Sequence, residues 1–203
     1  MGSQHDKHYL PKVDWTAQWK EHAPGFENGV LKVPIEGYGD VTLRPGPGFG
    51  DLSHPSTRLV LKLMPEIIPG RPVVDVGCGS GVLSLCAAAM GAKEVFGIDI
   101  SAEALQHSIE NRQLNNMDHV TFSFPDELLF VPDFPVILMN MIQSEQMEAW
   151  RSLSQLHPIQ ATLITSGILS SEKQSYLDQT ESWDWVLTDS LEEEGWSCFV
   201  FEK

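Results

Sequence analysis

The sequence has few basic residues, only three cysteines and no long hydrophobic run. Its 203 residues include 13 lysines and arginines against 28 aspartates and glutamates, a formal net charge of −15. A surface of that sign repels nucleic acid phosphates, so we expect no direct nucleic acid binding. The charge favours a basic protein partner or a small molecule. Because no stretch approaches the roughly 18 apolar residues of a membrane helix, we expect no membrane span.

The three cysteines lack the spacing of a metal site or of a redox motif. Cys78, Cys86 and Cys198 form no CxxC pair and no cluster with histidine. We therefore expect reduced, buried thiols and no metal ion. The polar stretch His5–His8 stands where a signal peptide would have its apolar core. These features predict a cytoplasmic protein, and a monomer is the default expectation.

Residues 1–50 are rich in glycine and proline, unlike the rest of the chain. Two short apolar pieces, Val30–Val33 and Val41–Leu43, stand between the turn residues. This pattern is typical of an extended arm with a hairpin rather than of a second domain. Trp15 and Trp19 are spaced as on one face of a helix. We interpret them as packing onto the main domain, with a partner-binding patch as the alternative.

Residues 51–203 alternate between strand patterns and helical periodicity. The strands are expected, in chain order, at Pro72–Val76, Val95–Ile100, His119–Phe124, Val136–Asn140 and Thr162–Ile168. The helices are expected from Pro55 with Leu59, Leu63 and Ile67 inward, at Val82–Met90, from Ser101 to about Asn115, around Met147, Trp150 and Leu153, and from Ser171. Continuous apolar strands linked by helices predict one doubly wound α/β domain with a mostly parallel sheet, which has seven strands when the two of the C-terminal hairpin are counted.

Two features complete the predicted domain. Ser171 and Gln174 have the spacing of a capping box at the start of the last helix. The apolar runs Trp183–Thr188 and Trp196–Phe201 flank an acidic turn and predict a closing hairpin. That hairpin would add an antiparallel strand at or near one edge of the sheet. In such sheets a ligand binds beyond the carboxyl ends of the parallel strands.

A glycine-rich turn follows the first strand of the domain, in the run Asp75–Gly81 (Asp-Val-Gly-Cys-Gly-Ser-Gly). Its glycines permit a tight turn and close approach of a ligand, and the next helix offers free N–H groups at its start. Asp99 ends the second strand, where a carboxylate can accept both hydroxyls of a ribose. Val82 stands where a dinucleotide fingerprint needs its third glycine. The pattern therefore predicts a nucleoside-type cofactor and disfavours a dehydrogenase.

The run Asp75–Gly81, followed by Gly-Ile-Asp-Ile at 97–100, resembles the first and second motifs of the class I methyltransferases. The resemblance implies S-adenosylmethionine as cofactor and S-adenosylhomocysteine as product. It implies that the Gly77–Gly81 turn holds the methionine portion, that Asp99 holds the ribose and that Asp75 orients the amino group. The residues expected to bind the cofactor are Phe49, Thr57, Asp75, Gly77, Cys78, Gly79, Gly81, Asp99, Ile100, Asp126 and Asn140.

Further motifs recur in the order of one methyltransferase family. They are Asp14-Trp15, Trp19-Lys20, Arg44–Gly50, His54–Arg58, Asn140 and Ser166–Leu169. Together they resemble the PrmA-like methyltransferases, which modify lysines and the N-terminal amine of a ribosomal stalk protein, without the N-terminal substrate-recognition domain those enzymes usually carry. The resemblance implies N-methylation of a protein substrate such as a ribosomal protein. The chain departs from the family at Asp51-Leu52-Ser53, where a threonine and a glycine are usual, and at Met139 and Met141 beside Asn140.

By that resemblance, Phe49 closes over the cofactor, Thr57 forms a hydrogen bond near it, and Asp126 lies where adenine is commonly bounded. Methyl transfer needs a positioned, desolvated and neutral nucleophile rather than a catalytic triad. Asn140 is expected to orient an amine by accepting a hydrogen bond through its side-chain oxygen, with a plain strand-end cap as the alternative. His54 is a candidate proton acceptor, with helix capping as its alternative.

Two other functions stay open on the sequence. One is a small-molecule methyltransferase that uses the same cofactor site. The other is a non-catalytic cofactor-binding scaffold, which the altered loop 51–53 supports and which the glycine-rich turn and Asp99 argue against. RNA base methylation is disfavoured, because the fourth strand lacks an Asn-Pro-Pro-aromatic signature and the net charge is negative.

Overall fold

The computed structural model describes residues 13–157 and 159–203, so His5–His8 lies outside the described residues. The helices are α1 Trp15–His22, α2 Pro55–Ile67, α3 Val82–Ala89, α4 Ala102–Leu114, α5 Gln143–Ser152 and α6 Lys173–Thr180. The strands are β1 Phe26–Glu27, β2 Val30–Ile35, β3 Gly39–Leu43, β4 Val73–Val76, β5 Val95–Ile98, β6 Val120–Ser123, β7 Val136–Asn140, β8 Thr162–Leu169, β9 Val186–Glu193 and β10 Trp196–Glu202. Short 3-10 turns lie at η1 Pro125–Glu127, η2 Ser154–Leu156, η3 Ser170–Glu172 and η4 Glu181–Trp183.

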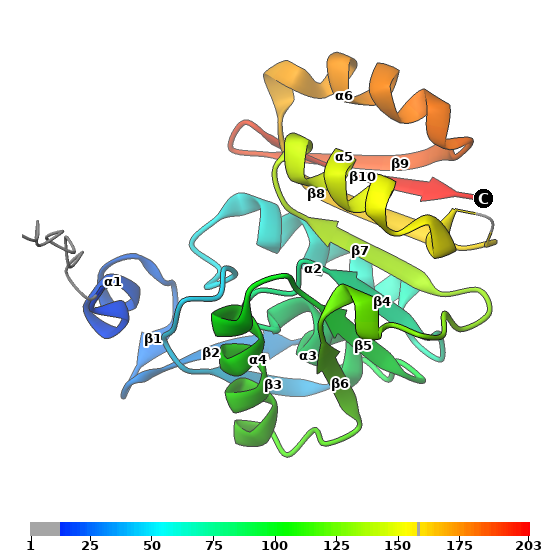
Figure 1. Ribbon diagram of the computed structural model, residues 1–203. Coiled ribbons are helices and arrows are strands. Elements are labelled where there is room, and N and C mark those ends of the chain that lie inside the picture. The colour runs from blue at the N-terminus through cyan, green and yellow to red at the C-terminus, as the bar shows by residue number, and fades with distance from the viewer. Residues whose placement is uncertain (1–12, 158) are drawn as a thin grey trace, which may run out of the picture.

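The central sheet has seven strands in the order β6-β5-β4-β7-β8-β10-β9 (Figure 1). Neighbouring strands from β6 to β8 pair in parallel, and β10 pairs antiparallel with both β8 and β9. Every residue of β4 and β7 is buried, as expected for parallel strands covered on both faces. The predicted doubly wound sheet with an antiparallel closing hairpin is confirmed.

The register of the parallel strands brings three chain segments to one edge of the sheet. Val76 at the end of β4 pairs with Ile98 of β5 and with Met139 of β7. The residues that follow, Gly77, Asp99 and Asn140, therefore lie side by side beyond the carboxyl ends of the strands. This edge is where ligands bind in doubly wound folds.

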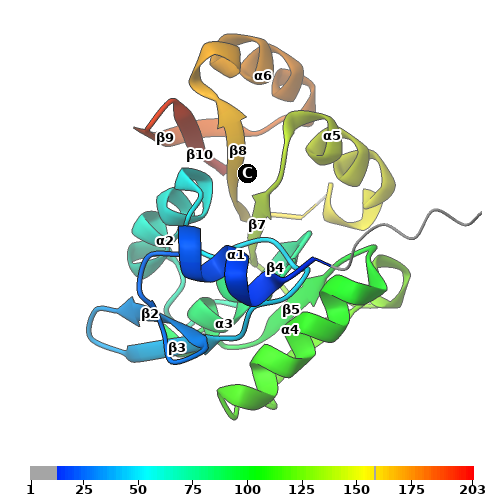
Figure 2. The same ribbon diagram turned by 90° about the vertical axis from the view of Figure 1, so that its left-hand side faces the viewer.

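Helices cover the two faces of the sheet, with α2 and α3 on one side and α5 and α6 on the other (Figure 2). The core on the first side includes Leu59 and Met64 of α2, which are 1% and 0% exposed. The second core is rich in aromatic side chains, with Trp150 of α5 stacked on Trp183 and Tyr176 of α6 fully buried. Burial of this much apolar surface is the main force that holds the layers together.

The N-terminal segment packs onto the main domain. Strands β1, β2 and β3 form an antiparallel sheet, which confirms the predicted hairpin. Figure 2 shows β2 and β3 beside α3, and Leu31 and Val41 are fully buried in the core that the segment shares with α2 and α3. Trp19 is 3% exposed, so its interpretation as a packing residue is confirmed. The domain boundary at residue 50 stays a prediction.

Two sequence predictions near the C-terminal helix are wrong. No capping box forms at Ser171, because α6 begins only at Lys173 and its N-cap residue, Glu172, makes no side-chain capping bond. Before α6 the chain is still bonded to the closing hairpin, because the backbone N–H of Ser170 donates to the carbonyl of Gly195 at 2.8 Å. The strand predicted from Trp183 begins at Val186 instead, since Trp183 ends a 3-10 turn and stacks on Trp150 in the core.

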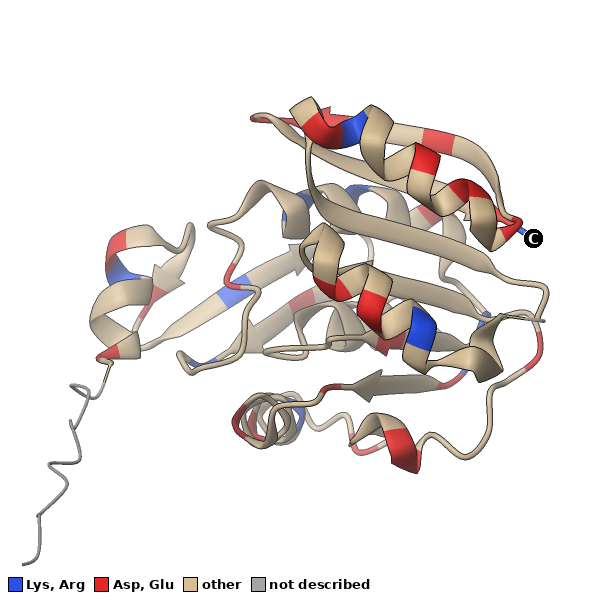
Figure 3. Cartoon of the chain, turned by 45° about the horizontal axis from the view of Figure 1, so that its top comes forward, with Lys and Arg blue, Asp and Glu red and all other residues tan. Residues whose placement is uncertain are grey.

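Charge and cysteine placement agree with the composition. Acidic side chains are spread over several elements, and lysines and arginines are fewer (Figure 3). Cys78, Cys86 and Cys198 are free and buried, as expected. In the part of the chain that the structure describes, no helix has both the length and the hydrophobicity to cross a membrane.

Candidate functional site

A cavity of about 550 Å³ opens at the carboxyl edge of the sheet. That volume is within the usual range of small-molecule and cofactor sites. The predicted residues that line it are Phe49, His54, Gly77, Gly79, Asp99, Ile100 and Asn140. The parallel register of β4, β5 and β7 brings Gly77, Asp99 and Asn140 together, and the segment before α2 adds Phe49 and His54.

Asp99 is held in place at the cavity wall by two backbone groups. Its Oδ2 accepts a hydrogen bond from the N–H of Gly79 at 3.0 Å, and its Oδ1 accepts one from the N–H of Ser101 at 2.9 Å. Ser101 also caps α4, as predicted, by accepting from the N–H of Ala104. Each carboxylate oxygen keeps a lone pair for a further donor, so the pair of ribose hydroxyls that the sequence suggests fits this geometry.

The glycine-rich turn lies directly against the loop that carries Phe49. The N–H of Ser80 donates to the carbonyl of Phe49 at 2.9 Å. A Cβ on Gly79, whose φ is +55°, would lie 2.7 Å from that carbonyl oxygen, and one on Gly48 would lie 2.5 Å from the carbonyl carbon of Gly79. Only glycines permit this close approach of two backbones. It places Phe49 at the cavity, with its side chain 52% exposed.

His107 of α4 holds the other side of the same loop, a role that the sequence did not indicate. Its Nδ1 accepts from the N–H of Gly48 at 3.1 Å, and its Nε2 lies 2.7 Å from the carbonyl oxygen of Arg44. The ring therefore has its proton on Nε2 and is neutral. Burial lowers the pKa of His107, which keeps the ring in this form. Nothing local in the sequence connects residues 44–48 with α4.

Asn140 ends β7 and is 9% exposed at the cavity. Its Nδ2 donates to the hydroxyl of Thr57 at 3.1 Å, whereas its Oδ1 is buried and has no partner among the described residues. Buried amide oxygens are nearly always paired, so this one is suited to accept a hydrogen bond from a ligand. Thr57 is fully buried and outside the cavity lining, and it bears on the site through Asn140.

His54 caps α2, which is the alternative that the sequence left open. Its Nδ1 accepts from the N–H of Ser56 at 3.3 Å and lies 2.8 Å from the hydroxyl of Ser56. Burial, followed by the charge of Arg58, lowers the pKa of His54. The ring also packs edge-on against Phe49 and Trp196, with centroid distances of 5.5 and 4.3 Å. A catalytic role for His54 stays a prediction.

Asp75 and Asp126 lie outside the cavity lining. Asp75 is fully buried behind the turn, where its Oδ2 accepts from the hydroxyl of Ser84 at 2.6 Å. Burial raises the pKa of Asp75 to about 6. Asp126 is exposed in η1, and its neighbour Pro125 lines the cavity instead. Direct contact of either carboxylate with a cofactor stays a prediction.

Cys78 and Gly81 also lie outside the lining, although both belong to the glycine-rich turn. Cys78 is 4% exposed, and burial raises the pKa of its thiol well above the usual range. Gly81 faces α4 and β6: a Cβ there would lie 2.8 Å from the ring of Phe122. The turn thus presents alternate residues, Gly77 and Gly79, to the cavity, while the others pack inward.

Two parts of the wall were missed by the sequence analysis. Trp196, at the start of β10, lines the cavity from the closing hairpin. Glu145 and Glu148 line it from α5, whose sequence drew attention only to its buried apolar face. Acidic residues on a helix usually face solvent, so their type and spacing carried no signal. Across residues 13–157 and 159–203, no group of three histidine, cysteine or acidic side chains is placed to hold a metal ion.

Comparison with known proteins gives consistent matches. The profile of the family "Ribosomal protein L11 methyltransferase (PrmA)" matches residues 4–203. A ribosomal protein L11 methyltransferase of Geobacter sp. (strain M21) is 34% identical over 208 residues, which cover 94% of this chain and 67% of that protein. The chain therefore spans about two thirds of the length of this relative.

Solved structures share the fold. The crystal structure of a ribosomal protein L11 methylase from Lactobacillus delbrueckii subsp. bulgaricus has a TM-score of 0.65 at 23% identity, with 78% of this chain and 82% of that chain covered. A Streptococcus mutans structure in complex with S-adenosylhomocysteine has a TM-score of 0.53 at 15% identity, with 70% and 94% covered. At these identities the likeness concerns the fold alone.

Proposed function

Since the chain belongs to the family of ribosomal protein L11 methyltransferases, we propose that it methylates an amine of a basic protein, with a ribosomal protein as the first candidate. It is an S-adenosylmethionine-dependent methyltransferase with a Rossmann-like fold. The observation that carries the proposal is the buried, unpartnered Oδ1 of Asn140 at the cavity. An acceptor in that position suits a substrate that brings an N–H donor.

The residues at the cavity fit S-adenosylmethionine. Gly77 and Gly79 line it without side chains, and their φ angles of +72° and +55° are ones that other residues rarely adopt, so the turn favours glycine at both positions. Asp99 presents a fixed carboxylate at the end of β5. We propose that the turn holds the methionine portion of the cofactor and that Asp99 accepts the ribose hydroxyls.

The chain's own residues would prepare the amine for attack. When bound, the cofactor supplies a methyl carbon that is activated by the neighbouring sulfonium. Asn140 would accept a hydrogen bond from the neutral amine and so direct the nitrogen lone pair. Phe49 and Trp196 would exclude water from the nitrogen, and desolvation of an amine favours its neutral, nucleophilic form. The amine itself must lose its proton before it reaches this position.

Charge supports a basic protein as substrate. Glu145 and Glu148 line the cavity from α5, and the chain has a net charge of −15. Complementary charge speeds encounter and selects partners more than it adds affinity. A ribosomal substrate would place the reaction in the cytoplasm.

The test is transfer of a labelled methyl group from S-adenosylmethionine to purified ribosomal protein L11. We expect the wild-type chain to label it, and Asn140→Ala to lower kcat/KM by about 10²-fold through loss of the orienting acceptor. The Kd for S-adenosylmethionine, measured by isothermal titration, should rise by less than kcat/KM falls, because Asn140 is predicted to lie beside the cofactor but to act mainly on the amine. Thr57→Val is the matched control and should cost less, since its hydroxyl reaches the substrate only through Asn140.

Absence of label on L11 and on other basic proteins, in a chain that still binds the cofactor, would refute the proposed substrate class. Equal loss in Asn140→Ala and Thr57→Val would instead show that the amide acts only as a structural cap.

A further inference from the structure

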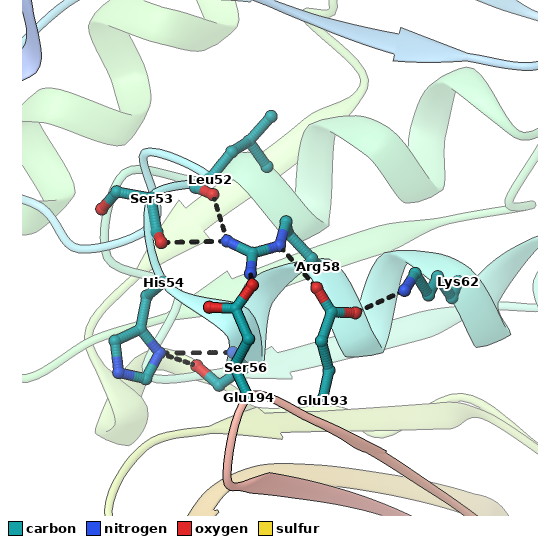
Figure 4. Close-up of polar contacts among 8 residues, drawn as sticks. All are labelled: Leu52, Ser53, His54, Ser56, Arg58, Lys62, Glu193 and Glu194. Atoms are coloured by element: carbon teal, nitrogen blue, oxygen red, sulfur yellow. Dashed lines mark hydrogen bonds and ion pairs between the residues drawn. The ribbon is translucent and has the colours of Figure 1, made fainter. Parts of the chain in front are cut away.

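Arg58, in the first turns of α2, links two chain segments that are distant in sequence (Figure 4). One terminal nitrogen, Nη1, donates to the carbonyls of Leu52 and Ser53 at 3.0 and 2.9 Å. Its Nε donates to Glu193 at 2.9 Å, and its Nη2 donates to Glu194 at 2.9 Å. One guanidinium therefore joins the loop before α2 to the turn between β9 and β10.

Both segments end at the cavity wall. The loop runs from Gly50 to His54, and Leu52 within it has a φ of +65°, a left-handed conformation that costs energy for a branched side chain. Such a conformation persists only where its surroundings hold it, and the carbonyl of Leu52 is one of the groups that Arg58 binds. On the other side, Trp196 follows Glu194 by two residues and packs on His54.

We propose that Arg58 is a positioning residue that holds the loop 50–54 and the hairpin turn together as the substrate-side wall of the cavity. The inference rests on the proposed function, since it assigns this wall to the amine substrate. It extends that function by naming a residue that touches neither substrate nor cofactor. Arg58 would act through His54 and Trp196, whose rings lie 4.3 Å apart at the cavity.

The chemistry of the contact requires arginine. A guanidinium presents five N–H donors in a rigid fork, whereas a lysine ammonium is a flexible point charge. Here the fork meets two carbonyls and two carboxylates at once. The Arg58 and Glu193 side chains are 25% and 21% exposed, so their ion pair is more protected than a surface pair. Glu194 is 67% exposed and contributes less.

Lys62 provides a natural control within the same network. It lies one helical turn after Arg58 and also pairs with Glu193, but it is 59% exposed (Figure 4). Among the described residues its ammonium makes no hydrogen bond to the loop 50–54. Replacement of Lys62 removes a positive charge beside Glu193, but it removes no hydrogen bond to Leu52 or Ser53.

The cofactor side of the cavity has separate supports. The carbonyl of Phe49 is held by Ser80, and the N–H of Gly48 is held by His107. Neither contact involves Arg58. The loop 50–54 meets the glycine-rich turn at Gly50, whose carbonyl accepts a hydrogen bond from the hydroxyl of Ser80 at 3.3 Å. Release of Leu52 and Ser53 beyond that anchor should therefore leave the turn and Asp99 in place.

The experiment compares Arg58→Ala, Arg58→Lys and Lys62→Ala in the full chain. We expect Arg58→Ala to lower kcat/KM for methylation of ribosomal protein L11 by about 10²-fold through misplacement of the wall. The Kd and the binding stoichiometry for S-adenosylmethionine should stay within about twofold. Arg58→Lys should recover part of the loss, and Lys62→Ala should match wild type.

Amide hydrogen exchange provides a readout that needs no substrate. Arg58→Ala should speed exchange in residues 50–56 and 193–196 and leave residues 76–82 unchanged, whereas Lys62→Ala should speed neither segment. If Arg58→Ala and Lys62→Ala behave alike, or if exchange in residues 50–56 is unchanged, the inference is overturned. A fall in cofactor stoichiometry together with kcat would show a general loss of folded protein and would equally overturn it. Absence of wild-type turnover would refute the proposed function, and the exchange comparison would still decide the role of Arg58.

Discussion

The two halves of the cavity are built in different ways. In the half that we propose binds the cofactor, the glycine-rich turn and Asp99 come from one continuous segment, β4 to β5, and the N–H of Gly79 donates to the Asp99 carboxylate. The half that we propose binds the substrate is assembled from the loop before α2, the end of β7, α5 and the closing hairpin. The first half depends on local conformation, and the second depends on side chains that meet only in the folded protein. The difference predicts that the two halves can be damaged separately.

The largest expected effect is loss of cofactor binding in Asp99→Ala. Asp99 accepts two backbone hydrogen bonds and is expected to bind the ribose, and hydrogen bonds to a charged group each contribute about 1.5–3 kcal/mol. We expect the Kd for S-adenosylmethionine, measured by isothermal titration, to rise by at least about 10²-fold. Asp126→Ala is the comparison variant: Asp126 is predicted to lie beside adenine but is outside the cavity lining, so its loss should raise the Kd by less. Equal losses in the two variants would mean that adenine contacts dominate and that Asp99 is not the main anchor.

A smaller effect is expected in Gly79→Ala, at the contact between the glycine-rich turn and the loop that carries Phe49. A Cβ at Gly79 would lie 2.7 Å from the carbonyl oxygen of Phe49, in addition to the cost of its positive φ. We expect a loss of about 1–3 kcal/mol in the free energy of unfolding, measured with urea. Gly91→Ala also introduces a side chain at a positive φ, here +83°, but nothing lies within 4 Å of the added Cβ, so it reports the backbone cost alone. If both variants lose the same stability, the close approach of the two loops is not a constraint.

The smallest effect is a pH dependence of stability at His107, which holds the same loop through Gly48 and Arg44. Burial holds the pKa of this ring below the value of about 6.5 expected in the unfolded chain. The unfolded state therefore binds the proton more readily, so the contribution of neutral His107 is complete above pH 6.5 and declines as the pH falls below it. His107→Gln keeps an acceptor for Gly48 and a donor for Arg44 but does not titrate.

Asp75 titrates in the same pH range as His107, so the effect of His107 must be measured as a difference between the wild type and His107→Gln. Because its pKa is raised to about 6 from 3.8, Asp75 makes the folded state bind more protons between those values, so its effect on stability falls as the pH rises through that window. The two groups therefore oppose each other in the wild-type chain. When the pH is lowered from 7.5 to 5.5, the free energy of unfolding measured with urea should fall more, or rise less, in the wild type than in His107→Gln. A constant difference between the two proteins would mean that His107 does not titrate in this range.

Much of the fold could be predicted from local patterns. The parallel strands were anticipated to within a few residues, because buried strands are continuous apolar runs bounded by turn residues. The prediction failed near Ser171 and Trp183, where contacts with the hairpin and with Trp150 override the local preference. Near Ser171 the backbone N–H of Ser170 bonds to Gly195, and at Trp183 the side chain stacks on Trp150, so in both places a distant partner decides the local structure.

The sequence by itself determined the glycine-rich turn of this protein and the carboxylate that faces it. A turn conformation that needs glycine and a carboxylate at a strand end are properties of neighbouring residues, so Gly77, Gly79 and Asp99 can be recognised without coordinates. Only the tertiary structure decided the roles of His107, Arg58 and Trp196. Each acts on a partner more than 50 residues away in at least one contact, and no short-range pattern encodes which distant side chain will satisfy a given backbone group.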